Sequence, residues 1–177
     1  MSASSCPFPD GLEEDCAARD NLLRRHASLF SLLLLGSLLA LALLGLLGGA
    51  RSPIAMAESD AARIVVKTPE VLRNGVFFET RITIEAKRDI AKPVLALPPA
   101  LWRDLTINSM VPQATDEAYE DGRFTFTYPA LKAGDRLEIK IDGQINPPLF
   151  AGTRGSVAVL DDTRPLVEVP VTMRVLP

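Results

Sequence analysis

The chain carries few side chains that combine into a reactive centre. It has two cysteines, Cys6 and Cys16, and one histidine, His26, and all three precede a long apolar block. A zinc site requires about four converging ligands, so this set predicts no metal centre and no cofactor. No cysteine follows the apolar block, which excludes a bacterial lipoprotein attachment there.

Nucleophilic catalysis needs a nucleophile beside a base, and the sequence marks no such pair. Ser156 stands in a Gly-Ser-Val context that lacks the second glycine of the Gly-x-Ser-x-Gly turn. A Ser–Lys dyad with Lys67, Lys87 or Lys140 stays open, and so does a Lys–Asn isopeptide cross-link. We therefore expect a protein that is not an enzyme.

The densest group of carboxylates is the segment 116–122, Asp-Glu-Ala-Tyr-Glu-Asp-Gly. Hard cations such as Ca²⁺ bind several oxygen ligands, but this segment lacks the alternating ligand spacing of an EF-hand loop. A solvated connection between strands is the favoured interpretation. The same holds for Asp161 and Asp162, which stand beside Arg164.

Two aromatic residues are candidate binding anchors. Trp102 is the only tryptophan, and Tyr119 lies in the acidic segment. An exposed tryptophan would anchor a partner, whereas a buried one would plug an end of a small domain, and the second alternative is favoured.

The segment 143–155 combines two prolines, an aromatic residue and several glycines. Rigid loops of this kind often carry binding residues, so Gln144, Asn146, Phe150 and Arg154 are candidates for partner contact. A long connection packed on the edge of the domain is the alternative.

Net charge argues against a nucleic-acid partner. The whole chain has a formal charge of −3, and 15 basic against 17 acidic residues follow Arg51. Nucleic-acid binding needs a basic face that displaces counterions from phosphates, and no such excess is present.

Residues 29–48 contain no charged side chain and are dominated by leucine. A helix of that length matches the ~30 Å apolar thickness of a bilayer, so we expect a transmembrane signal-anchor over 29–49. Arg19, Arg24 and Arg25 precede it, which favours a cytoplasmic N-terminus. Residues 1–28 are then a disordered cytoplasmic tail, because they are too polar to form a core.

The small residues that follow the apolar block leave one alternative open. Ala55-Met56-Ala57 fits a signal-peptidase site, with cleavage after Ala57. The apolar run is longer than a usual signal sequence, so a retained anchor is favoured, with a linker over 50–62.

Beyond the linker, apolar and polar residues alternate with a period of two. Phe124, Phe126 and Tyr128 alternate with polar residues, and similar alternations begin near residues 82, 137 and 167. Turn signals separate them. Seven or eight short strands predict an all-β domain over 63–177, an antiparallel β-sandwich, with a closed barrel as the alternative.

Two stretches resemble the immunoglobulin-like repeat domains of bacterial surface proteins. One is Thr80–Ala86 followed by Ala96–Trp102, and the other is Phe124–Ile141 with its Leu-Lys-Ala-Gly-Asp core. The resemblance covers residues 63–145 and departs from the family in its single copy and its extra C-terminal strands. It implies an immunoglobulin-like β-sandwich with a spacer or adhesive role rather than catalysis.

Together these features predict a membrane-anchored interaction module. Residues 29–49 would lie in the lipid bilayer of a bacterial inner or plasma membrane, and the β-domain would face the periplasm or the exterior. We expect an envelope or membrane protein as its partner. The alternative is the solute- or glycan-binding ectodomain of a sensor, for which Trp102 and Tyr119 are the candidate contacts.

Overall fold

The computed structural model describes residues 22–47, 52–102, 105–146 and 152–176. The chain divides into two compact units, Met1–Leu43 and Leu44–Pro177. The predicted tail lies outside the described residues up to position 21.

The first unit contains helix α2 (Leu22–Leu43), which begins before the predicted span over 29–49 and ends before its last residues. Its leucines from position 29 onward are mostly exposed. Among the described residues, no helix meets both the length and the apolarity that crossing a membrane requires.

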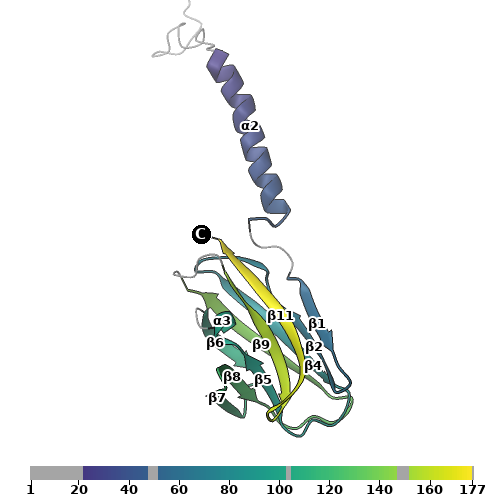
Figure 1. Cartoon of the computed structure of the whole chain (residues 1–177). Coiled ribbons are helices and arrows are strands. Elements are labelled where there is room, and N and C mark those ends of the chain that lie inside the picture. The colour runs from purple at the N-terminus through teal and green to yellow at the C-terminus, as the bar shows by residue number, and fades with distance from the viewer. Residues whose placement is uncertain (1–21, 48–51, 103–104, 147–151, 177) are drawn as a thin grey trace, which may run out of the picture. The chain divides into compact units, whose positions relative to one another are not determined.

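The second unit is a sandwich of two β-sheets (Figure 1). The first sheet has the order β1-β2-β4-β9-β6 and the second has the order β3-β11-β10-β5-β8-β7. The strands of the first sheet are β1 (Ile54–Glu58), β2 (Ala62–Lys67), β4 (Phe77–Ala86), β9 (Arg136–Ile145) and β6 (Leu105–Val111). Those of the second are β3 (Val71–Arg73), β11 (Arg164–Leu176), β10 (Thr153–Asp161), β5 (Pro93–Leu97), β8 (Arg123–Thr127) and β7 (Asp116–Glu120). A short helix, α3 (Pro99–Trp102), follows β5.

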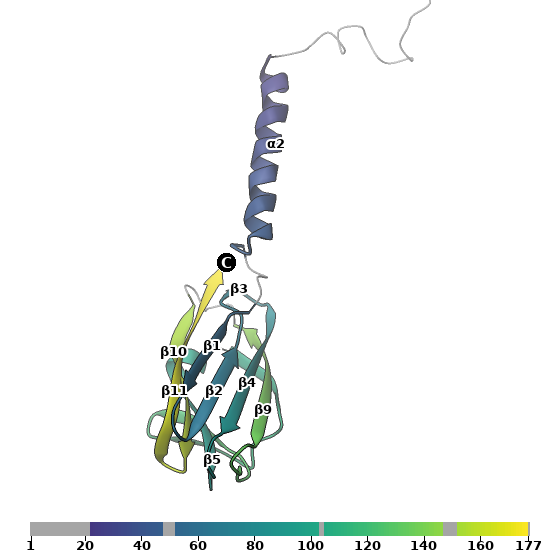
Figure 2. The same cartoon turned by 90° about the vertical axis from the view of Figure 1, so that its right-hand side faces the viewer.

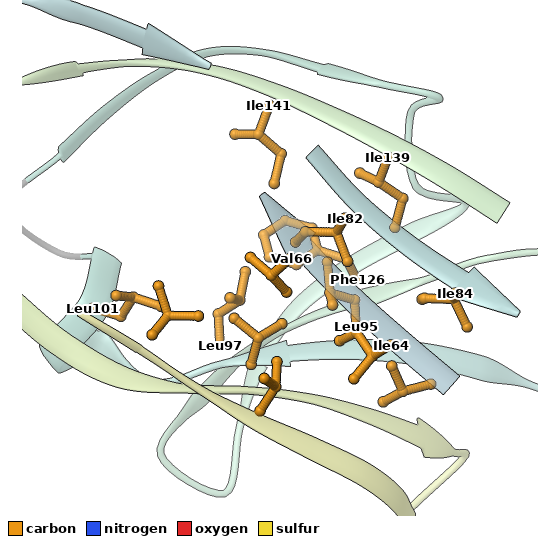
Figure 3. Close-up of a cluster of buried hydrophobic side chains, with 14 of the residues drawn as sticks. Ile64, Val66, Ile82, Ile84, Leu95, Leu97, Leu101, Phe126, Ile139 and Ile141 are labelled. Carbon is orange, nitrogen blue, oxygen red and sulfur yellow. The ribbon is translucent and has the colours of Figure 1, made fainter. Parts of the chain in front are cut away.

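The predicted alternation sets which side chains enter the core. Ile82 and Ile84 on β4 and Ile139 on β9 are at most 1% exposed, while Arg81, which precedes Ile82, and Glu138, which precedes Ile139, face solvent. Figure 3 shows these isoleucines gathered with Leu95, Leu97 and Phe126 of the opposite sheet. Burial of one face of each sheet favours the two-layer arrangement, and the expected β-sandwich is confirmed.

The structure adds strands that the sequence did not predict. Strand β1 lies inside the predicted linker over 50–62, and pairs with β2 from Ile54↔Lys67 to Glu58↔Arg63. Alanines and a single isoleucine give β1 little intrinsic preference for a strand, so the open edge of β2 decides its conformation. Strand β3 is also new and pairs in parallel with β11, so the sheets are not entirely antiparallel.

Strand β7 corrects the interpretation of the acidic segment. Residues Asp116–Glu120 form an edge strand that pairs with β8, where a connection was expected. The carboxylates disfavour a strand when considered alone, but the tight turn at Asp121 and Gly122 folds them back on β8 as a hairpin.

Candidate functional site

One apolar hollow lies at one side of the sandwich, between the edge strands of the two sheets. Strand β6 is an edge of the first sheet and β7 is an edge of the second, with β8 beside it. Figure 1 shows α3, β6, β7 and β8 together on the side away from β1. We call the hollow between them the Trp102 groove. It has a volume of about 470 Å³.

The lining of the Trp102 groove is apolar at its floor and polar at its rim. The apolar residues are Trp102, Ile107, Met110 and Phe126, and the polar residues are Asn108, Ser109, Gln113 and Glu117. Ligand-binding clefts typically combine a mostly apolar lining with a few polar groups. This composition suits a ligand or peptide that buries one apolar group and forms hydrogen bonds around it.

Trp102 reaches the groove because α3 carries the chain from the second sheet to the first. The helix follows β5 and precedes β6, and the Leu101 amide donates to the Pro98 carbonyl at 3.0 Å. Leu101 is buried, which fixes the helix on the core. Gly155 of β10 permits this close packing, since a Cβ there would lie 2.6 Å from Pro98 Cγ.

The Trp102 ring packs on the core and also lines the groove. It stacks on Phe126 with ring centroids 5.7 Å apart and an interplanar angle of 30°. The Trp102 side chain is half-buried, so part of the ring faces the groove. The Trp102 side chain therefore combines the two predicted alternatives: one part of it packs on the core, and another part is exposed to the groove.

Strand β8 joins the two predicted aromatic anchors into one surface. Phe124 and Phe126 lie two residues apart on β8 and therefore share a face of the sheet. Tyr119 lies opposite Phe124 on β7, packs edge-to-face on it at 5.1 Å, and is 59% exposed. We call Tyr119, Phe124, Phe126 and Trp102 the aromatic row. No local sequence pattern predicts this grouping, because Trp102 and Tyr119 belong to different elements.

A buried phenol supports the groove from within. Tyr128 is 2% exposed, and its hydroxyl contacts Met110 Sδ at 3.1 Å. Burial raises the pKa of Tyr128 strongly, and the negative charge of Glu117 raises it further. Tyr128 is therefore a neutral hydrogen-bond donor at physiological pH, and it fixes Met110 in the groove lining.

Strand β6 contains an irregularity where it borders the groove. The register with β9 shifts between Ile107 and Ser109, so Asn108 has no direct partner residue. Bulges occur often at sheet edges and next to binding sites, where they redirect side chains. Here the bulge brings the exposed Asn108 to the rim, beside Ser109, whose hydroxyl donates to Asp142 at 2.9 Å.

The predicted partner-binding loop is not a single loop. Gln144 belongs to β9 and donates to the Gly75 carbonyl at 3.1 Å, while Asn146 accepts from the Thr106 hydroxyl at 2.8 Å. Arg154 lies exposed on β10, and Phe150 lies outside the described residues. The side-chain amides of Gln144 and Asn146 thus serve the fold, which the sequence pattern cannot reveal.

The carboxylates considered for metal binding are dispersed or paired. Asp161 accepts from the Lys92 amide at 2.8 Å, and Asp162 forms an ion pair with the Lys92 ammonium at 2.7 Å, rather than with Arg164. In the described part of the chain, no three His, Cys, Asp or Glu side chains form a cluster suited to a metal ion.

Two of the three lysines considered for a Ser–Lys dyad, Lys87 and Lys140, are engaged with carboxylates. Lys87 pairs with Glu58, and Lys140 lies 3.0 Å from Glu79 and 3.4 Å from Asp142. Those two carboxylates raise the pKa of Lys140, whereas a lysine base needs a lowered pKa. Lys140 is therefore poorly suited to activate a serine.

Comparisons with known proteins give no family but several remote structural neighbours, among them a CARDB domain and a cohesin. No family model matches the chain, and no curated protein matches it. The CARDB domain of a Pyrococcus furiosus protein, solved with di-metal ions, is 13% identical, with a TM-score of 0.39, over 68% of this chain and 100% of that one. A non-cellulosomal cohesin from the archaeon Archaeoglobus fulgidus is 13% identical, with a TM-score of 0.38, over 72% of this chain and 93% of that one.

Proposed function

We propose that this chain is a membrane-anchored, non-enzymatic interaction module. Its β-sandwich would lie outside the cytoplasm of a bacterium and bind another envelope or membrane protein. The Trp102 groove is the observation that carries this proposal, because it offers an apolar floor and a polar rim between two free sheet edges. A partner segment would insert an apolar side chain against Trp102.

Membrane anchoring is supported by the exposed leucines of α2. Leu33, Leu39 and Leu43 are 63%, 62% and 81% exposed. Large exposed apolar surfaces are rare on monomeric proteins in water and are typical of segments that meet lipid or partners. Arg24 and Arg25 precede these leucines in the sequence and favour a cytoplasmic N-terminus.

Strand β1 supports a retained anchor over a cleaved signal peptide. Cleavage after Ala57 would remove four of the five β1 residues that pair with β2. The edge of β2 would then lose its hydrogen-bonding partner, and Ala55 and Ala57 would no longer pack against the core. A chain that keeps its N-terminal helix keeps this strand.

The experiment is site-specific cross-linking of the full chain in native membranes. A photoreactive amino acid at Gln113, on the groove rim, should capture one membrane protein, and the same probe at Glu138, on the outer face of β9, should not. Trp102→Ala should reduce capture at Gln113 by roughly tenfold or more, since truncating an interface tryptophan often removes 2 kcal/mol or more. Met56→Ala is the matched control, because Met56 is an exposed apolar residue on the opposite edge. Equal capture at both probe positions would contradict the groove as the binding site.

The second candidate function is the solute- or glycan-binding ectodomain of a sensor. The aromatic row is the observation that supports it. Tyr119 and the exposed part of Trp102 belong to the same row and offer ring faces on which a sugar could stack. Trp102 is the only tryptophan of the chain, so its fluorescence reports directly on the groove. A saturable change in emission with a soluble glycan, together with no protein capture at Gln113, would favour this second function.

A further inference from the structure

One end of the sandwich presents exposed apolar side chains on an ordered turn. Val76 and Phe77 are 43% and 69% exposed. The turn before them is fixed by hydrogen bonds, since the Gly75 amide donates to the Ile145 carbonyl at 3.1 Å. Gly75 has a φ of +76°, which a residue with a side chain rarely adopts. The fold therefore holds these two apolar side chains in water at a defined place.

The same end receives the chain from the N-terminal helix. Strand β1 begins at Ile54, which pairs with Lys67, and Lys67 pairs with Arg81 of β4. Phe77 precedes Arg81 by four residues, so it projects about 13 Å beyond the level of Ile54. Figure 2 shows the start of β1, the start of β4 and the end of β11 at one end of the sandwich. We call it the linker end.

The charges of the linker end differ from those of the opposite end. Lys67, Arg73 and Arg174 are exposed at the linker end, and none forms an ion pair with another described residue. Glu70 is also exposed there, which leaves an excess of positive charge.

At the opposite end, four basic side chains are paired with neighbouring carboxylates, while Arg164 is exposed and forms no ion pair with another described residue. The pairs there are Lys87–Glu58, Arg88–Asp60 at 3.4 Å, Lys92–Asp162 at 2.7 Å and Lys132–Asp89 at 2.9 Å. The linker end thus combines three unpaired cations with the exposed apolar side chains of Val76 and Phe77.

We propose that the linker end binds the surface of an anionic lipid bilayer. Phe77 and Val76 would enter the headgroup region, and Lys67 and Arg73 would contact lipid phosphates, as cations near anionic membranes do. The inference rests on the proposed membrane anchoring. Helix α2 ends at Leu43 and β1 begins at Ile54, so ten residues lie between them, and the 11 Cα–Cα steps from Leu43 to Ile54 span at most about 40 Å. An anchored chain therefore keeps the linker end within reach of the bilayer.

The first test uses the domain 52–177, whose core lies entirely between Ala62 and Val175 and needs no disulfide. It should sediment with vesicles that contain phosphatidylglycerol, and less so with pure phosphatidylcholine or at high salt. Phe77→Ser should lower the bound fraction roughly tenfold or more, the scale of withdrawing one aromatic ring from an apolar environment. Lys67→Gln with Arg73→Gln should lower it by a similar factor.

Matched control variants distinguish binding through the linker end from nonspecific binding of the domain to vesicles. Val111→Ser removes an apolar residue that is 59% exposed, against 69% for Phe77, from β6, and Lys132→Gln removes a cation from the opposite end. Both should leave vesicle binding unchanged. Equal losses in the Val111→Ser and Phe77→Ser variants would overturn the proposal.

A second measurement uses the full chain and does not depend on the affinity of the isolated domain. In a Trp102→Phe background, Phe77→Trp places the only tryptophan at the linker end. After reconstitution in anionic vesicles, brominated lipids should quench its emission, and an unquenched tryptophan would overturn the proposal. Membrane fractionation of the full chain tests the anchoring separately. If the domain 52–177 binds vesicles but the full chain is not found in the membrane fraction, only the proposed anchor is contradicted.

Discussion

Trp102 is held by its contact with Phe126 and by the fixed position of α3, and this fixes the shape of its groove. Phe126 supports one face of its ring, and α3 is fixed by buried Leu101 and by the absence of a side chain at Gly155. A binding residue that is already immobilised loses little conformational entropy when a ligand binds. The groove is therefore already formed, which would favour binding of the proposed partner segment.

Gly155 permits a residue-scale test of this support. Gly155→Ala would bring a Cβ within 2.6 Å of Pro98 Cγ and 3.1 Å of Leu101 Cβ, so α3 must move. We expect a loss of roughly 1–3 kcal/mol in the free energy of unfolding, the usual cost of overpacking. Urea denaturation measures that loss, and Trp102 emission reports displacement of the helix. Ser156→Ala on the same strand is the control and should cost less than about 1 kcal/mol.

At the scale of whole elements, the four edges of the two sheets differ in how they are protected. Strand β6 is interrupted by its bulge, β7 carries four carboxylates within or beside it, and β3 is short. Bulges, charges and short strands all hinder edge-to-edge aggregation. Strand β1 carries one charged residue, Glu58, and its other residues are the apolar Ile54, Ala55, Met56 and Ala57. Strand β1 in turn covers the edge of β2 and so protects that edge from pairing with another chain.

Removal of β1 tests that function. A chain that begins at Glu58 should be less stable than one that begins at Ser52 by roughly 2–4 kcal/mol, because several strand hydrogen bonds and part of the core contact are lost. It should also aggregate at lower concentration, since the edge of β2 becomes open. Thermal unfolding and light scattering of the two chains measure both effects. Equal stability would show that β1 is dispensable and would remove the structural argument against cleavage after Ala57.

At the scale of the whole molecule, the outer face of the first sheet is a lattice of ion pairs. Glu79 pairs with Arg81 at 2.5 Å and with Lys140 at 3.0 Å, and Arg63 lies between Glu58 and Glu85. These pairs are exposed, so each one contributes little at physiological salt. Their main effect is to pair the charged side chains of this face with one another. The linker end, with its unpaired cations, and the Trp102 groove, with its apolar floor, differ from this face.

The lattice predicts how stability depends on pH. The Arg81 guanidinium, followed by Lys140, lowers the pKa of Glu79 below 4.5, and Lys87 lowers the pKa of Glu58 in the same way. Because the folded pKa lies below the unfolded value, the stabilisation is present at neutral pH and is lost as pH falls below about 4.5. Thermal melts should therefore show a lower melting temperature for Glu79→Gln than for the parent chain at neutral pH. The gap should close in acid, and a gap that stays constant with pH would contradict this account.

The sequence alone determined the class of the domain and the faces of its long strands. The period-two pattern around Ile82, Ile139 and Val169 requires one buried and one solvated face, whatever the topology. The sequence also marked Trp102 and Tyr119 as candidate anchors. It could not place them, because nothing local records that the hairpin of β7 and β8 brings both to one face.

The tertiary structure decided what depends on contacts between distant segments. Strand β1 forms because β2 offers a free edge, and the acidic β7 forms because β8 lies beside it. Gln144 and Asn146 form hydrogen bonds at the domain surface because Gly75 and Thr106 of neighbouring segments face them. Neighbours supplied by other strands are absent from any local pattern, so the groove and the charged linker end emerge only when the two sheets are packed together.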